Sequence, residues 1–174
     1  MAKIIALMEA VSSATVGGWA NIANITDAKA VHITGLSGTD RLQLHTSAAP
    51  AAVILNEAVT IPAPTGPYTR TANHGADYLA SIRVREAVTN ILFQKVTGTP
   101  AAGQYTVSNA GVYTFHASDA TADVLLDYLY IAHSLQYGTD HATSEIVAIP
   151  ERIGWLRATK TVGGTGATSV YFIG

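Results

Sequence analysis

Histidines and carboxylates gather in the segment HSLQYGTDHATSE (133–145), the first part of the chain whose residue types could do chemistry. His133, Asp140, His141 and Glu145 are all side chains that bind metal ions in proteins. The spacing of the two histidines matches no common ligand pattern, however, and a glycine between them would interrupt a helix. We therefore interpret the segment as a solvated polar loop, or as a contact with a neighbouring subunit, and expect no metal site.

Three aspartates, Asp119, Asp123 and Asp127, recur at every fourth residue. On a helix they would share one face and could act as paired catalytic acids or as calcium ligands. The sequence VLLDYLY (124–130) is typical of a strand, which would separate the three carboxylates. We expect no catalysis from them and interpret Asp119 as a turn or capping residue.

Two further motifs have the residue types of a phosphate loop and of a hydrolytic triad, but not the surrounding structure that these sites need. GGTG (163–166) could cradle a phosphate, but it leads into the strand-like SVYFI (169–173) instead of a helix and carries no lysine, so we interpret it as a hairpin turn. His116, Ser118 and Asp119 are the residue types of a hydrolytic triad. Neighbours in a β corner cannot reach the geometry that a triad requires.

Arginines and tryptophans provide the last candidates. Arg83 and Arg85 share one face of a predicted strand and could bind phosphate or sugar, but we favour a role in solubility or a pair with an acidic residue of another subunit. Trp19 and Trp155 could form a glycan-binding platform. Because both precede strands at matching positions, we interpret them as core residues. We expect no catalytic, cofactor-binding or metal-binding residue, and no enzyme.

Composition restricts the partners. The net charge is −2 at pH 7 and the basic residues are scattered, so we expect no binding to nucleic acid. The apolar runs 4–8 and 128–132 are far shorter than the roughly 20 residues of a membrane-spanning helix. Glu9 interrupts the N-terminal run, which is a poor signal peptide, and we expect no membrane partner. The chain has no cysteine, which excludes disulfides and thiolate nucleophiles and fits synthesis in the cytoplasm.

Apolar residues make up 48% of the chain and charged residues only 13%. The charged share is about half of that in a usual soluble domain. Without a membrane span, such a chain is expected to bury apolar surface against copies of itself or another protein. We therefore expect a homo-oligomer.

A hydrophobic period of two dominates the sequence and predicts strands. The alternating runs are VHITG (31–35), RLQLH (41–45), SIRVRE (81–86), GQYTV (103–107), VYTFH (112–116), WLRAT (155–159) and SVYFI (169–173). GLSGTD (35–40) and SNAG (108–111) predict turns, and VGGTGAT (162–168) predicts a hairpin loop. One helical turn is expected at 118–123, capped by Ser118 or Asp119. Segment 3–11 fits a strand or a short helix.

The fold class that follows is all-β: a β-sandwich, jelly-roll or immunoglobulin-like, with little helix and an inserted or second small β module. Segments 19–47 and 149–174 share a plan of tryptophan, strand, glycine turn and strand, which indicates two parts of one sandwich. A Pro-rich stretch (62–67) and a polar stretch (133–145) bound the middle of the chain. We expect 1–61 plus 146–174 to form the sandwich and 62–145 to form the inserted module. The alternative is that residues 62–145 belong to the same sheets as the rest of the chain.

The segment PAAGQYTVSNAGVYTFHASDATADVLLDYLY (100–130) resembles a recurring segment of tailed-bacteriophage structural proteins, in which a hairpin G-x-Y-x-V … G-V-Y-x-F-x-x-x-D-A precedes an apolar strand that ends in tyrosine. The matching residues are Gly103, Tyr105, Val107, Gly111, Val112, Tyr113, Phe115, Asp119 and Ala120. The flanking segments resemble β-sandwich modules on phage heads, collars and tails. The resemblance implies a virion component.

The expected function is therefore that of a non-enzymatic structural protein of a bacteriophage particle, made in the host cytoplasm and located in the virion. A head decoration or cement protein that stabilises the capsid is our first interpretation, with the chain itself and the major capsid protein as partners. A tail, collar or neck component is the alternative, and a carbohydrate-binding adhesion module is a further one. The N-terminal MAKIIALMEAV (1–11) could add a strand to a neighbouring sheet.

Overall fold

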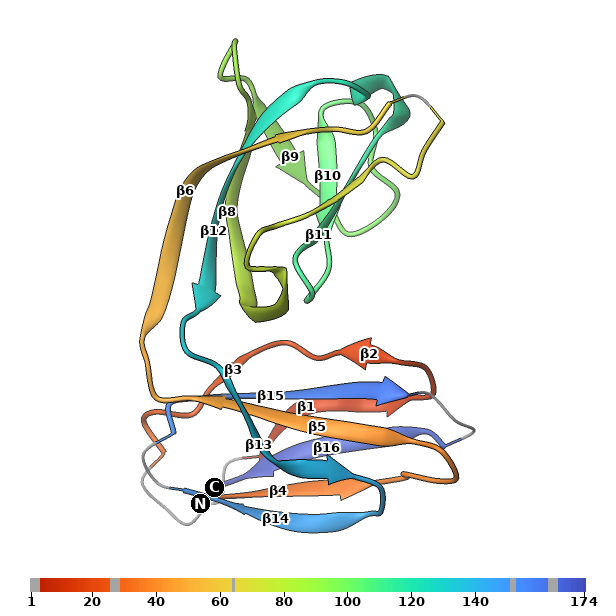
Figure 1. Ribbon diagram of the computed structural model, residues 1–174, viewed down its shortest axis with the longest axis vertical. Helices are drawn as coiled ribbons and strands as arrows, with labels where there is room; N and C mark the ends of the chain where they lie inside the picture. Colours follow the sequence, from red (N-terminus) through yellow and green to blue (C-terminus); the bar gives the residue numbers. More distant parts are fainter. Residues whose placement is uncertain (1–3, 26–28, 64, 151–152, 163–165) are drawn as a thin grey trace. The chain divides into compact units, whose positions relative to one another are not determined.

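The computed structural model describes residues 4–25, 29–63, 65–150, 153–162 and 166–174. The chain forms two compact units: the first comprises Met1–Pro50 and Ala132–Gly174, and the second comprises Ala51–Ile131 (Figure 1). The second unit is thus an insertion into the first. Both of its boundaries lie earlier in the sequence than the expected 61/62 and 145/146. The reason is pairing: strand 51–60 pairs inside the insertion, and strand 135–141 pairs inside the first unit.

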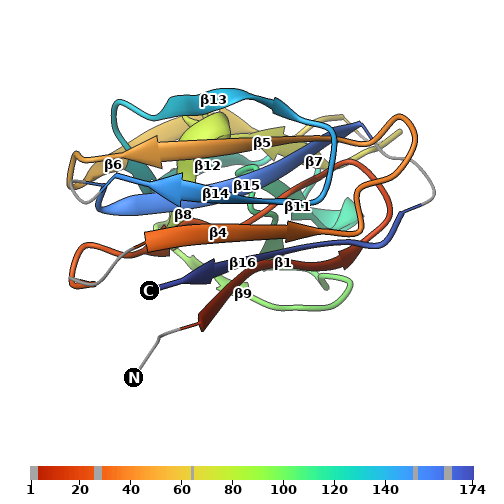
Figure 2. The same ribbon diagram turned by 90° about the horizontal axis from the view of Figure 1, so that it is seen from below.

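Two antiparallel sheets build the first unit. Its strands are β1 (Ile4–Val11), β2 (Thr15–Val16), β3 (Ala20–Asn21), β4 (Lys29–Thr34), β5 (Arg41–Ser47), β13 (Leu135–His141), β14 (Glu145–Ile149), β15 (Trp155–Val162) and β16 (Thr168–Ile173). One sheet has the order β1-β16-β4-β14 and the other the order β13-β5-β15-β2, with β3 also pairing with β15. In Figure 2 the strands of the two sheets run in roughly the same direction.

This strand order is that of a jelly roll. With β3 set aside and the other strands numbered one to eight in chain order, the sheets read 1-8-3-6 and 2-7-4-5, and every neighbouring pair is antiparallel. The chain changes sheet at each connection except the one from β5 to β13, which are paired neighbours. The all-β sandwich expected from the sequence is confirmed, and its topology is the jelly-roll alternative.

The core of the jelly roll lies between the two sheets and follows the period-two pattern. In β4 and β16 every second residue is buried, and β5 alternates in the same way. The buried cluster takes side chains from both sheets, namely Leu7, Met8, Ile22, Val31, Ile33, Leu42, Leu44, Ile149, Leu156, Ala158, Val170 and Phe172. At roughly 25 cal/mol per Å² of apolar surface, this burial is the main stabilising term of the unit.

The two similar segments noted in the sequence lie side by side. β4 pairs with β16 and β5 pairs with β15, so each strand–turn–strand segment contributes one strand to each sheet. The loops 35–40 and 162–168 therefore join opposite sheets. The expectation of a hairpin at 162–168 is wrong, because consecutive alternating strands can also face each other across a core instead of pairing.

The N-terminal segment is a strand of its own unit. β1 is the edge strand of its sheet and pairs with β16 along its length, with two register shifts. The expectation that this segment adds a strand to a neighbouring sheet does not describe this structure, in which its pairing partner is in the same chain.

The inserted unit is one curled sheet of seven strands in the order β6-β12-β8-β9-β10-β11-β7. The strands are β6 (Ala51–Thr60), β7 (Thr69–Thr71), β8 (Tyr78–Glu86), β9 (Leu92–Lys95), β10 (Gln104–Val107), β11 (Val112–Phe115) and β12 (Asp123–Ile131), with 3₁₀ turns η1 (Gly75–Asp77) and η2 (Ala117–Asp119). Among the described strand pairs of this unit, β9 and β10 are the parallel one. Arg70 of β7 donates a hydrogen bond to the Thr60 carbonyl of β6, so the two outer strands approach each other and the sheet closes around its own core.

The insertion begins and ends on paired strands. Ala51, its first residue, pairs with Ile131, its last, in the antiparallel ladder of β6 and β12. β5 and β13, which precede and follow it along the chain, are also an antiparallel pair. The insertion therefore takes the place of a hairpin loop, which a jelly roll tolerates because both ends of the insertion leave from neighbouring strands.

Aromatic side chains fill the core of the inserted unit. Tyr78, Tyr105, Tyr113 and Tyr128 are each exposed by 4% or less. The rings of Tyr105 and Tyr113 have centroids 5.6 Å apart, and Tyr78 meets Tyr113 edge-on at 6.0 Å. The hairpin SNAG (108–111) joins β10 and β11 as the sequence predicts. The tyrosine-rich stretch therefore builds the interior of a small β module.

Hydrogen bonds anchor two of these hydroxyls. The Tyr128 hydroxyl donates to the Glu57 carboxylate at 2.5 Å, and Tyr105 and Ser81 share a hydrogen bond of 2.8 Å. Burial raises the pKa of all four tyrosines above the usual value. For Tyr78, repulsion from Tyr113 adds to burial, and for Tyr128 the hydrogen bond to Glu57 adds to it.

Across the described ranges, no helix is long and apolar enough to cross a membrane.

Alkaline pH is expected to unfold the inserted unit. The folded state favours the neutral phenol, so this stabilisation is complete below the pKa of an exposed tyrosine, about 10, and is lost as pH rises above it. The titration is followed by tyrosinate absorbance at 295 nm. Four of the eight tyrosines should ionise at a higher pH than exposed tyrosines, and the near-ultraviolet circular dichroism should be lost in the same pH range. Ionisation of all eight near pH 10 with the fold intact would contradict this account of the core.

Candidate functional site

The histidine and carboxylate segment is divided between two strands and the turns beside them. The expectation of a loop is wrong, because Leu135–His141 is the edge strand β13 and Glu145 begins β14. His141 Nδ1 lies 2.8 Å from Glu145, whereas Asp140 accepts hydrogen bonds from Gln43 and Gln136. In the described ranges, no group of three or more histidine, aspartate or glutamate side chains could hold a metal ion.

The three spaced aspartates are separated, as the predicted strand requires. Asp119 lies in η2, where both of its carboxylate oxygens accept the amide of Gly103 at 3.1 Å. Asp123 accepts a hydrogen bond of 2.6 Å from the Thr60 hydroxyl. Asp127 is fully buried in β12 and binds another strand. Asp123 and Asp127 thus both fasten β12 to β6, whereas Asp119 fastens η2 to the chain before β10.

The nominal triad is a capping arrangement. His116 Nδ1 accepts the Ser118 amide at 3.1 Å and caps η2, so the cap is His116 and not Ser118 or Asp119 as expected. In the motif GGTG, residues 163–165 lie outside the described residues. Gly166 is described, and its carbonyl accepts a hydrogen bond from Lys160.

Arg83 and Arg85 bind partners in their own chain. Arg83 forms an ion pair with the buried Asp127, and Arg85 donates hydrogen bonds to Asn56 and Asn90. The expected pairing with another subunit is therefore replaced by contacts that join β6, β8, β12 and the β8–β9 turn.

The two tryptophans are not core residues, contrary to expectation. Both are half-buried, and neither belongs to the buried cluster of the jelly roll. Trp19 lies against the guanidinium of Arg157, whose Cζ is 4.6 Å from the ring centroid, while Trp155 pairs with Asn21 and Ser47. One indole face of Trp19 is thus occupied by a cation, and this face is not available for stacking on a sugar.

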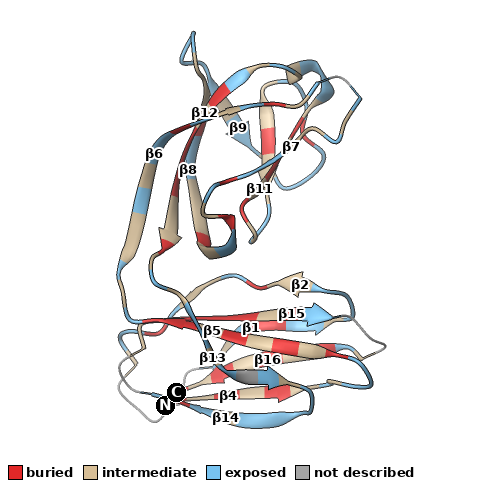
Figure 3. Cartoon of the chain, in the orientation of Figure 1, coloured by how far each residue is buried: buried red, intermediate tan, exposed pale blue. Residues whose placement is uncertain are grey.

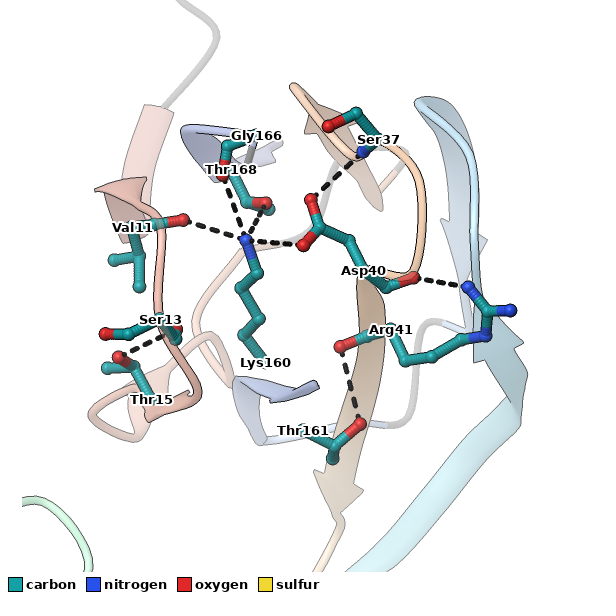
Figure 4. Close-up of polar contacts among 10 residues, drawn as sticks. All are labelled: Val11, Ser13, Thr15, Ser37, Asp40, Arg41, Lys160, Thr161, Gly166 and Thr168. Atoms are coloured by element: carbon teal, nitrogen blue, oxygen red, sulfur yellow. Dashed lines mark hydrogen bonds and ion pairs between the residues drawn. The ribbon is translucent and has the colours of Figure 1, made fainter. Parts of the chain in front are cut away.

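A buried ion pair lies inside the jelly roll (Figure 4). Lys160 of β15 and Asp40, which precedes β5, have no exposed side-chain surface, and their Nζ and Oδ1 atoms lie 3.1 Å apart. Lys160 Nζ also donates to the carbonyls of Val11 at 3.1 Å and Gly166 at 3.0 Å, and to the hydroxyl of Thr168 at 2.9 Å. All donors of the ammonium are used inside the fold, so it is not a group that could act on a substrate.

Two glycines let the loops close over this pair. A Cβ added at Gly166 would lie 2.2 Å from the carbonyl oxygen of Gly35, and one added at Gly35 would lie 2.3 Å from that of Ala167. Asp40 Oδ2 accepts the amide of Ser37 at 3.0 Å in the first loop. Gly35 therefore packs against Gly166 and Ala167, and the ion pair fastens Gly166 as well as the loop 35–40.

Exposed apolar side chains mark a different part of the chain. On the inserted unit, Val53 and Leu55 of β6 and Ile82 of β8 are exposed by 51%, 58% and 49%, and we call these three residues the outer face. Figure 3 shows exposed stretches on β6. Val53 pairs with Leu129 of β12, which pairs in turn with Ala80 of β8, so apolar residues also lie between the exposed ones.

One ion pair and one hydrogen bond fix the bulge beside the outer face. Asp127 accepts the amide of Asn56 at 2.6 Å and pairs with Arg83, at the point where β12 changes register against both neighbours. A bulge that is fixed in this way keeps two residues of β6, Leu55 and Asn56, opposite one residue of β12. The outer face is thus a preformed surface able to contact another protein.

The sequence contained signals for both features. Lys160 takes the same face of its strand as the buried Leu156 and Ala158, which marks it as an inward-pointing lysine that needs a partner. β6, AAVILNEAVT, is long and carries a single charge, Glu57, which points into the core. A strand of this type without a protecting charge on its exposed residues indicates a contact surface.

Comparisons of the chain with protein-family models, with curated proteins and with solved structures find no match.

Replacing Lys160 by methionine is expected to destabilise the jelly roll by about 3–5 kcal/mol, because it leaves the Asp40 carboxylate buried without its counter-charge. The double variant Lys160→Met with Asp40→Asn should lose clearly less free energy of unfolding than Lys160→Met, because no unpaired charge is then buried. Lys95→Met, at an exposed position of β9, is the matched control. Urea unfolding measures all three, and a loss in Lys160→Met no larger than in the control would contradict the importance given to the pair.

Proposed function

We propose that this chain is a non-enzymatic structural protein of a bacteriophage particle, and that it acts as a head decoration or cement protein. The observation that carries the proposal is the outer face: an exposed apolar surface on a β module inserted into a jelly roll. Contiguous apolar surface on a soluble protein marks a site of contact with another protein. The partners are copies of the chain and the major capsid protein, in a virion assembled after synthesis in the host cytoplasm.

The fold supports this proposal without deciding it. Jelly rolls are common in viral capsid proteins, but also in lectins and cupins, so the topology alone is an analogy. The resemblance of the segment 100–130 to phage structural proteins points in the same direction. This segment forms β10, β11, η2 and most of β12, and is therefore the aromatic framework on which the outer face is built.

A tail, collar or neck component would use the same architecture, and copy number separates it from a head decoration. Quantitative mass spectrometry of density-purified phage particles, produced by a host that carries the gene, gives this number relative to the major capsid protein. A decoration protein should be present in copy numbers close to that of the capsid protein. A few copies per particle would indicate the tail or neck, and absence from the particles would overturn the proposal.

The outer face should be required for incorporation into particles. Val53→Asp places a charge in the contact surface and is expected to reduce the incorporated amount at least tenfold, because a buried unpaired charge is strongly unfavourable. Val162→Asp, at an exposed valine of the jelly roll, is the matched control and should be incorporated normally.

Both variants are first compared with the unchanged chain by thermal unfolding, so that loss of folding is not mistaken for loss of contact. Equal incorporation of Val53→Asp and the unchanged chain would show that the outer face is not required for contact with the particle.

A further inference from the structure

A second surface of the inserted unit lies at the turn between β8 and β9. It contains a cavity of about 430 Å³, within the size range of protein binding pockets. Glu86 at the end of β8, Ile91 after the turn and Phe93 of β9 line one part of it, and Ser118 and Asp119 of η2 line another. The cavity is separate from the three residues of the outer face.

The lining combines apolar walls with uncompensated negative charge. Ile91 and Phe93 contribute hydrophobic surface, and Phe93 is held edge-on against Phe115 with ring centroids 5.9 Å apart. Glu86 and Asp119 contribute two carboxylates, and none of the described residues that line the cavity is basic. A ligand that fits this lining is apolar along its length and positively charged at its end.

Both carboxylates are held in place by hydrogen bonds from the backbone. One oxygen of Glu86 accepts the amide of Thr89 at 2.6 Å and its hydroxyl, and these hydrogen bonds lower the pKa of Glu86. Asp119 is fixed by the amide of Gly103. Carboxylates that are already oriented lose little freedom when they bind a cation, which favours binding.

The rim of the cavity favours a protein as the occupant. Val88 is exposed by 82%, Ile91 by 65% and Leu92 by 63%, and all three lie in or beside the turn that borders the cavity. Exposed aliphatic residues around a charged recess are typical of protein–protein contacts, in which apolar contacts exclude water around a central polar anchor. A sugar, by contrast, offers few apolar groups to such a rim.

We propose that this cavity binds an arginine or lysine side chain of a partner polypeptide, with its aliphatic part against Phe93 and Ile91 and its cation at Glu86 and Asp119. The inference deepens the proposed function, because it gives the chemistry by which a neighbouring subunit is recognised. An arginine suits the site best, since its guanidinium can bind a carboxylate through two hydrogen bonds.

The test uses the whole chain and the blocked peptide acetyl-Leu-Arg-Leu-amide, with binding followed by two-dimensional NMR. We expect millimolar affinity, with shifts centred on Phe93, Ile91 and Gly103 that weaken as salt is added. The same peptide with citrulline, which has the shape of arginine without its charge, should bind at least tenfold more weakly.

Glu86→Gln should reduce the affinity for the arginine peptide at least tenfold while leaving the spectrum of a folded protein, because glutamine can still accept the Thr89 amide. Glu145→Gln, in the jelly roll, is the matched control and should change nothing. Equal binding of the arginine and citrulline peptides, no binding of either, or a hexose that occupies the cavity in place of the peptide would each overturn the inference. These results do not depend on the presence of the chain in particles, so failure here and failure of the proposed function are distinguishable.

Discussion

The buried ion pair between Lys160 and Asp40 links the two sheets of the jelly roll, whose apolar core lies between them. Removing two charges from water is costly, and the cost is offset only because the ammonium also binds two carbonyls and a hydroxyl. Those acceptors come from the end of β1 and from the chain entering β16, in one sheet, whereas Lys160 lies in a strand of the other sheet. The pair therefore joins the two sheets where their glycine loops meet, at a place that apolar contacts alone would not fix.

A fixed jelly roll explains how the chain carries its second unit. Only one connection of this fold, from β5 to β13, joins two paired strands, and the insertion occupies it. The inserted sheet has its own aromatic core, so its outer residues are not needed for internal packing. Val53, Leu55 and Ile82 are free to contact other proteins, and the ion pair and hydrogen bond of Asp127 fix the bulge beside them. In the proposed function, the jelly roll is the scaffold and the inserted unit carries the contact surface.

Much of this fold could be predicted from the sequence, and the failures have identifiable physical causes. Alternation in RLQLH and SVYFI gave the strands correctly, but alternation does not say which strands pair, so the loop 162–168 was expected to be a hairpin. Polarity placed the unit boundary after 145, although Leu135 and Tyr137 pair with β5. The contact surface was missed because a long apolar run such as AAVILNEAVT also fits a buried strand. The partner of Lys160 lies far away in sequence, and only the fold brings it near.

A cryo-electron microscopy map of phage particles that contain the chain tests the central claim most directly, namely that the inserted unit is the part that contacts its neighbours. The account predicts density for other subunits against Val53, Leu55 and Ile82 and over the turn between β8 and β9. A map in which these residues face solvent, while the jelly roll makes all contacts with the particle, would contradict it.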